Sequence, residues 1–318
     1  MDESFEYRPL LDRDTLRNLQ QRSDIPSLVH LVLHLASFAT SAAFVVLFSS
    51  LPALAFPACV MLGAIWATLF APFHECTHQT AFRSSCLNAI GAWLTGFLYG
   101  MAPAVYRDFH FTHHRFTHDP ARDPEILGAP SVAVWPTAPI AWIWMIAGLW
   151  FVWLKVGSMV RISCSSAENV ALAPAWAERD HWARIVWQTR AVALAWAVLL
   201  VLAIFRVRGA GWLLLALLLS HFFQAVWLTS EHTGLPHEGT ILARTRTTLT
   251  SPFISWFLWN MNYHAEHHAW PAIPWHALPS AHRLVAKHVQ HQSPGYWRLQ
   301  LAVLRKTNLP DGVSTVVW

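Results

Sequence analysis

Three short segments of the sequence place histidines at spacings that put imidazoles on one face of a helix. They read HECTH at residues 74–78, HFTHH at 110–114 and HAEHH at 264–268. Side chains three and four positions apart share a helix face, so each segment can direct its imidazoles at a metal ion. A single HxxxH pair is weak evidence in a chain with 19 histidines. Three such segments, two with the same HxxHH pattern, indicate a metal site.

These segments supply more imidazoles than one metal ion binds. A zinc site takes four ligands, so we expect two metal ions with about four or five ligands each. A ninth imidazole is available in SEHTG, after the last apolar run, and Asn260 could add an oxygen directly or through water. All-nitrogen ligation suits iron, zinc or copper alike. The candidate histidines are His74, His78, His110, His113, His114, His232, His264, His267 and His268.

Carboxylates beside these segments are expected to orient the ligand imidazoles by accepting their ring N–H groups. No catalytic residue is predicted beyond the metal ligands. His118 lies four residues after His114, but the following Asp-Pro ends the helix, which favours a supporting or substrate-side role over ligation. His30 and His34 are also four apart, and we expect them to pack between helices. The predicted supporting carboxylates are Glu75, Asp119, Asp123, Glu231 and Glu266.

The elements that must position these residues are membrane helices. The chain of 318 residues is 54% hydrophobic and only 13% charged, whereas soluble proteins carry about 25% charged residues. Apolar runs at 28–48, 51–73, 133–154, 190–205 and 210–228 each approach the ~20 residues that a spanning helix needs. The net charge of +4 comes without a basic stripe of the nucleic-acid-binding kind. The four cysteines show no paired spacing. We predict an all-α integral membrane protein that binds no nucleic acid.

The histidine segments can meet only if they share one side of the membrane. The weak run at 87–105 then cannot cross, and neither can one of the later runs. We assign the second non-crossing segment to 133–154, because its Trp135, Trp142 and Pro136 are typical of an interfacial helix. The expectation is four spanning helices in two hairpins. Residues 1–26 would form a cytoplasmic leader with a short amphipathic helix, and 27–318 a single domain.

The three segments resemble the histidine boxes of the membrane fatty acid desaturase/hydroxylase superfamily. The resemblance rests on HECTH, HFTHHRFTHDPARDPE and NMNYHAEHHAWPAIPWHALP, and SEHTG is similar to a further motif of alkane monooxygenases. The last box also resembles a bacterial branch near rhizopine oxygenase. The resemblance implies a non-haem di-iron centre on the cytoplasmic side of a multi-pass protein, most plausibly in a bacterial inner membrane. It also implies O2 as co-substrate and assigns the nine histidines as ligands.

The resemblance also implies an external electron donor, since no haem or iron–sulfur domain is recognisable in the sequence. Ferredoxin, rubredoxin and cytochrome b5 with a reductase are the donors of this superfamily. Exposed arginines near the boxes would receive an acidic ferredoxin, or would only satisfy the positive-inside rule. These are Arg83, Arg107, Arg115 and Arg122.

The leading functional prediction is desaturation of a lipid acyl chain. Hydroxylation of a lipid or of a pathway-specific small metabolite is the alternative, because the same oxidant performs both reactions and substrate positioning selects between them. A zinc-dependent membrane hydrolase is a second alternative, although it needs only three histidines and a water. A transporter is less consistent with histidines at helix ends, since transport sites lie near the bilayer midplane.

Overall fold

The computed structural model describes residues 7–128 and 139–306. Helices dominate these residues, and the strands described among them form one parallel pair of two residues each. The predicted all-α class is therefore confirmed. In chain order the elements are η2 (Arg8–Leu10), α1 (Arg13–Leu19), α2 (Ile25–Leu47), α3 (Pro52–Thr68), α4 (Phe70–Thr77), α5 (Ser85–Tyr99), α6 (Pro103–Phe116), α7 (Pro124–Gly128), α9 (Pro139–Ile146), α10 (Leu149–Cys164), η3 (Val170–Leu172), η4 (Arg179–His181), α11 (Trp182–Arg206), α12 (Ala210–His232), β1 (Thr247–Thr248), α13 (Pro252–Phe257), α14 (His264–Ala269), α15 (Leu278–Val285), η5 (Ala286–His288), β2 (Gln292–Ser293) and α16 (Tyr296–Lys306).

Four helical segments of the described residues are long and apolar enough to cross a membrane. They are Ile25–Leu47, Pro52–Thr77, Arg179–Arg206 and Ala210–His232. The chain is therefore a multi-pass membrane protein with four such helices, or five spans if the bent pair α9 and α10 crosses as one. The helices α9 and α10 meet at 65°, and they include most of the run that we assigned to the interface. Trp135 and Pro136 of that run lie outside the described residues.

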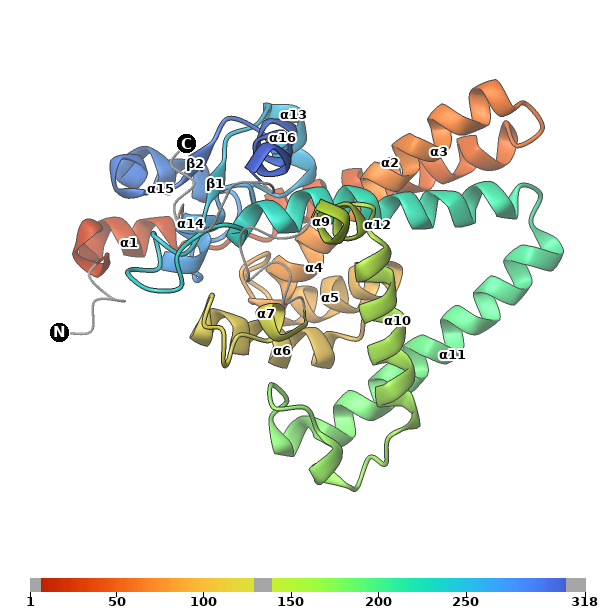
Figure 1. Ribbon diagram of the computed structural model, residues 1–318, viewed down its shortest axis with the longest axis horizontal. Helices are drawn as coiled ribbons and strands as arrows, with labels where there is room; N and C mark the ends of the chain where they lie inside the picture. Colours follow the sequence, from red (N-terminus) through yellow and green to blue (C-terminus); the bar gives the residue numbers. More distant parts are fainter. Residues whose placement is uncertain (1–6, 129–138, 307–318) are drawn as a thin grey trace.

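The spans form two hairpins, α2 with α3 and α11 with α12, whose tips point to the same side in Figure 1. The tips contact each other, because the Trp212 indole donates to the Ser49 carbonyl over 3.2 Å. Two glycines allow the close approach. A Cβ at Gly209 would lie 2.4 Å from Ser49 Cβ, and one at Gly63 would lie 2.8 Å from Leu219 Cβ in α12. This packing fixes α2, α3 and α12 relative to one another, whereas α11 diverges from α12 beyond the tip (Figure 1).

The histidine segments lie at those opposite ends, away from the hairpin tips (Figure 1). The weak run at 87–105 is broken there, because α5 ends at Tyr99 and α6 begins at Pro103. Cys76 is fully buried, and its Sγ would lie 2.6 Å from a Cβ at Gly91 in α5. It is therefore a packing residue, and α4 rests directly on α5.

Short elements cover the histidine ends of the spans. The N-terminal segment forms α1, capped by the Asp12 carboxylate, which accepts from the backbone N–H groups of Asp14 and Thr15. This is the short helix expected in the leader. The helices α14 and α15 follow, and the β1–β2 pair joins residue 247 to residue 292. A core of buried aromatic and aliphatic side chains, including Trp259 and Trp270, lies beneath them.

Candidate metal centre

Four helices bring the histidines together. His74 and His78 lie at the end of α4, three more histidines at 110, 113 and 114 on α6, and His232 at the last position of α12. The helix α14 begins at His264 and carries the remaining two. The histidines of α4 and α12 lie at the C-terminal ends of two membrane spans, and they therefore lie at the same depth relative to the membrane. The amphipathic spacing on α6 and α14 then turns their imidazoles toward that level.

The nine histidines fall into two groups, each compact enough to hold one metal ion. One group contains five residues and the other four, and within each group the ligand atoms lie within 4.8 Å of one another. The four-histidine group is fully buried, whereas His114 in the five-histidine group is partly exposed. Asn260 belongs to neither group. The five-histidine group is His74, His78, His110, His114 and His267, and the four-histidine group is His113, His232, His264 and His268.

The ring nitrogens of each group converge in a way that suits a bound cation. His74 Nε2 lies 2.8 Å from His267 Nε2, and His264 Nε2 lies 3.0 Å from His232 Nε2. The Nδ1 of His232 contacts the Arg244 carbonyl oxygen at 2.9 Å. A carbonyl oxygen can only accept, so this Nδ1 carries the proton and the His232 Nε2 is a bare lone pair. Lone pairs directed at one point repel each other unless a metal ion binds them.

Electrostatics keep most of these rings neutral, as metal ligation requires. Burial is the largest cause, and neighbouring imidazoles add to it. The pKa of each of the following rings lies well below its usual value: His110, His114, His264, His267 and His268. His113 differs, because the carboxylates of Asp123 and Glu125 outweigh burial and raise its pKa to about 9. A metal ion binding at His113 must therefore displace a proton.

Two of the five predicted supporting carboxylates contact a histidine of the groups. The Asp123 carboxylate accepts from His113 Nδ1 at 2.9 Å. Glu231 Oε1 lies 3.3 Å from His264 Nδ1. Both side chains lie beside a ring of the four-histidine group, and the Asp123 bond fixes the His113 ring so that Nε2 faces that group.

The other three carboxylates differ from the prediction. Glu75 accepts from the Thr80 hydroxyl at 2.8 Å, Glu266 pairs with His282 Nδ1, and Asp119 pairs with Arg122. Each is adjacent to a histidine box in sequence, but on a helix the neighbouring position points to another face. His282 lies half-buried against Glu266. Adjacency in sequence was the wrong criterion for these groups.

Sequence analysis missed several groups that occupy the other ring nitrogens. The Tyr106 hydroxyl lies 2.9 Å from His74 Nδ1, and the Thr117 hydroxyl lies 3.1 Å from His268 Nδ1. Tyr106 is one helical turn before His110 and is buried, and this spacing was its one signal. The Arg244 carbonyl, which accepts from His232, has no signal in the sequence. Hydroxyl and carbonyl oxygens thus do much of the work that we assigned to carboxylates.

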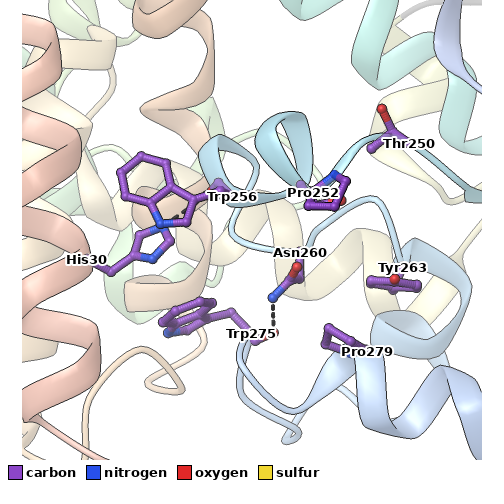
Figure 2. A pocket seen from close by; sticks show the side chains of 9 residues that line it. His30, Thr250, Pro252, Trp256, Asn260, Tyr263, Trp275 and Pro279 are labelled. Atoms are coloured by element: carbon purple, nitrogen blue, oxygen red, sulfur yellow. Dashed lines mark hydrogen bonds between the residues drawn. The ribbon is translucent and has the colours of Figure 1, made fainter.

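Asn260 lies beside the centre but faces away from it. Its amide nitrogen donates to the Trp275 carbonyl over 3.1 Å, and its side chain lines a surface pocket of about 280 Å³ (Figure 2). His30 lines the same pocket, stacked on Trp256 with ring centroids 4.2 Å apart. His34 bonds the Thr68 hydroxyl at 3.1 Å. His30 and His34 are therefore packing residues, as predicted, and the amide nitrogen of Asn260 is bonded to the Trp275 carbonyl.

His118 is buried and also lies outside both groups. Its Nδ1 contacts the Pro236 carbonyl at 2.9 Å, and its ring stacks on His237. His221, inside the last span, contacts the Leu217 carbonyl one turn earlier through Nδ1. This bond pairs the His221 ring with a carbonyl of its own helix, and His221 is not part of the metal centre.

Comparison with known proteins gives a consistent picture. A family described as fatty acid desaturase matches residues 50–300. The chain is 22% identical over 253 residues to the Delta(5) fatty acid desaturase fat-4 of Caenorhabditis elegans, covering 72% of this chain and 56% of that protein. It is 24% identical over 233 residues to the sphingolipid delta(4)-desaturase/C4-monooxygenase DES2 of Mus musculus, covering 72% of this chain and 65% of that one. The chain thus spans somewhat more than half the length of these relatives.

Proposed function

Because the chain belongs to the fatty acid desaturase family and is an oxidoreductase of the membrane, we propose that it is an O2-dependent di-iron oxidase of lipid C–H bonds. Desaturation of an acyl chain is the proposed main reaction. The observation that carries this proposal is the sorting of nine imidazoles into two adjacent groups of five and four. A hydrolase with one zinc ion would need only one of them.

We assign the five-histidine group to one iron and the four-histidine group to the other. The donor set supports the assignment, because buried ring nitrogens converge within each group at distances that suit a shared metal ion. Bound iron would supply the reduction of O2 and the removal of hydrogen from an unactivated carbon. Asn260, whose amide nitrogen donates to the Trp275 carbonyl, stays a proposed further ligand through its amide oxygen, directly or through water.

The protein's own part is to orient the rings and to exclude water. Tyr106, Thr117 and the Arg244 carbonyl hold the Nδ1 atoms of three ligands, and Asp123 holds a fourth. All four side chains of the four-histidine group are buried, and this burial keeps bulk water from competing with the substrate. Because these four rings are held through Nδ1, they need little reorganisation when a metal ion binds.

The relatives support a lipid substrate and also favour a second candidate reaction. The name of the nematode relative describes desaturation of a fatty acid, and the name of the mouse relative combines desaturation with monooxygenation of a sphingolipid. Hydroxylation by this chain is therefore the second candidate. An acyl-CoA, an acyl-carrier protein, a phospholipid and a small metabolite are the substrate forms to compare.

We place the centre on the cytoplasmic side of a bacterial inner membrane. Positive charges in loops mark the cytoplasmic side, and many arginines flank the histidine ends of the spans. Two arginines at the opposite hairpin tip, Arg206 and Arg208, run against this count. The arginines that support it are Arg17, Arg83, Arg107, Arg115 and Arg122.

A separate one-electron carrier with an acidic surface, such as a ferredoxin, a rubredoxin or a cytochrome b5, is the proposed electron donor. Arg107 and Arg115 are exposed on α6, and the Arg107 guanidinium lies 4.9 Å from the centre of the Phe111 ring. That ring lies 5.2 Å from the His78 ring. The exposed face of α6 therefore combines positive charge with a short path to the five-histidine group.

Arg122 provides a matched control for this docking face, because Asp119 already neutralises it at 2.5 Å. Changing Arg107 and Arg115 together to alanine is expected to raise the KM for the donor several-fold and to flatten its salt dependence. Arg122→Ala should leave both unchanged. Equal effects of the two changes would show that these arginines serve only membrane orientation.

The first test of the proposed function is the metal content of the detergent-purified protein, followed by product analysis with a reconstituted ferredoxin system. Two irons per chain and O2-dependent unsaturated lipid are the expected results. An alcohol in place of the alkene would establish the hydroxylase. Zinc alone, with no O2-dependent product after iron reconstitution, would overturn the proposal in favour of a hydrolase.

A further inference from the structure

His118 has a backbone conformation that non-glycine residues rarely adopt. Its φ is +61°, which costs about 1–3 kcal/mol and persists only where the surroundings hold it. The surroundings do so from both sides. The His118 N–H donates to Asp123 at 2.6 Å, and the His118 carbonyl accepts from His237 Nδ1 at 2.9 Å. Strain held in this way is typical of functional positions.

The same contacts fix which nitrogen of the His118 ring carries the proton. His118 Nδ1 lies 2.9 Å from the Pro236 carbonyl oxygen, and a carbonyl oxygen can only accept, so the proton is on Nδ1. His118 Nε2 is therefore a lone pair. The residue is only 1% exposed, and Nε2 has no hydrogen-bond partner among the described residues. Leaving a buried acceptor unpaired costs about 1–3 kcal/mol, so this atom needs a donor.

The His118 ring lies next to the four-histidine group. Its centroid is 5.8 Å from that of His232, closer than the 6.5 Å between His74 and His114, which share the five-histidine group. The turn that carries His118 is bound to this group at two more points. Thr117 contacts the ring of one ligand, His268, and Asp123 joins the backbone of His118 to a second ligand, His113. The strained turn thus belongs to the wall of the four-histidine group.

We propose that His118 Nε2 is the acceptor for a water that completes the coordination of the metal ion held by the four-histidine group. The inference rests on the proposed two-metal centre and extends it. A single intervening water fits better than direct ligation, because the four ligand atoms lie within 4.8 Å of one another and His118 is outside that set. The water would supply the donor that Nε2 needs. His118 is thus a positioning residue, which would hold that water beside the four-histidine group.

Two substitutions separate this role from the structural one. In His118→Asn the side-chain amide nitrogen replaces Nδ1 and can still donate to Pro236, asparagine tolerates positive φ, and Nε2 is lost. In His118→Gly the strain is relieved, and added imidazole can replace the ring. His181, which pairs with Asp108 and belongs to neither group, offers His181→Asn as a control.

The experiment is titration of the metal-free, detergent-purified chain with Co2+ alone, followed by visible absorption. The wild type is expected to bind two Co2+ ions. His118→Asn should weaken one of them by roughly 10–100-fold, the usual effect of losing a contact around the ligands, and change the absorption of that ion only. Imidazole should restore both properties in His118→Gly. His181→Asn should behave as the wild type.

Each other outcome has a definite meaning. Wild-type Co2+ affinities and spectra in His118→Asn and His118→Gly, with folding verified by circular dichroism, would overturn the role of His118 and leave the two-metal centre standing. Fewer than two Co2+ ions in the wild type would overturn the proposed function itself. Both variants could instead lose one Co2+ ion completely. If imidazole restored that ion and its spectrum showed an additional nitrogen ligand, His118 would be a direct ligand and the intervening water would be refuted.

Discussion

Replacing Asp123 by asparagine tests how the four-histidine group is held. The Asp123 carboxylate accepts from three donors: His113 Nδ1 at 2.9 Å, the His118 N–H at 2.6 Å and the Glu125 N–H at 2.9 Å. An asparagine amide has one acceptor oxygen and a donor in place of the other. The change therefore leaves at least one buried donor without a partner and removes the negative charge beside His113.

The expected magnitude follows from burial. Both side chains of the Asp123–His113 pair are 1% exposed, and breaking a buried charged pair costs about 3–5 kcal/mol. We expect Asp123→Asn to lower the free energy of unfolding of the metal-free protein by about 3 kcal/mol. Metal affinity should fall by roughly 10–100-fold, and the metal of the four-histidine group should be lost first.

Asp119 provides the matched control, because the two aspartates are four residues apart and only one contacts a ligand. Asp119 pairs with Arg122, whose side chain is 62% exposed, and such surface pairs contribute about 0–1 kcal/mol. Unfolding in detergent by circular dichroism and metal content by mass spectrometry measure both variants. Equal stability and equal metal content in Asp119→Asn and Asp123→Asn would refute the reasoning.

Three further changes test other parts of the molecule. His267→Ala should abolish activity and lower metal content, whereas His30→Ala should keep the metal and lower the free energy of unfolding by about 1–3 kcal/mol, because it removes a buried hydrogen bond; metal analysis and thermal unfolding distinguish them. Tyr106→Phe leaves a ligand ring without its Nδ1 contact, and metal titration should show a roughly tenfold weaker site. Gly63→Ala places a Cβ 2.8 Å from a neighbouring side chain and should cost about 1–3 kcal/mol, whereas Gly211→Ala, with nothing within 4 Å, should not destabilise the helix.

The spans and the histidine boxes were predictable because both are local patterns. A run of apolar residues predicts a spanning helix regardless of its neighbours, and four such segments are found. The spacing of His110, His113 and His114 predicts a shared helix face in the same way. Even the division of the box has a local basis, since His110 and His114, four apart, enter one group and His113 enters the other.

Which boxes meet was decided by tertiary structure. His267 of the last box joins the first box, and His113 of the second box joins His232. This crossing depends on the packing of α4, α6, α12 and α14, which residue spacing within one helix does not encode. Spacing specifies the direction of a side chain about its own axis and leaves its distance to another helix open.

The contacts around the ligands were also decided by tertiary structure. Adjacency in sequence pointed to Glu75, Asp119 and Glu266, whose carboxylates bond elsewhere. His232 instead donates to the Arg244 carbonyl. Because every residue has a backbone carbonyl, no residue type in the sequence predicts this contact. The sequence by itself determined which imidazoles could bind metal, because side-chain chemistry and helical period are local. The fold decided how they are grouped, because a hydrogen bond depends on distances between segments far apart in the chain.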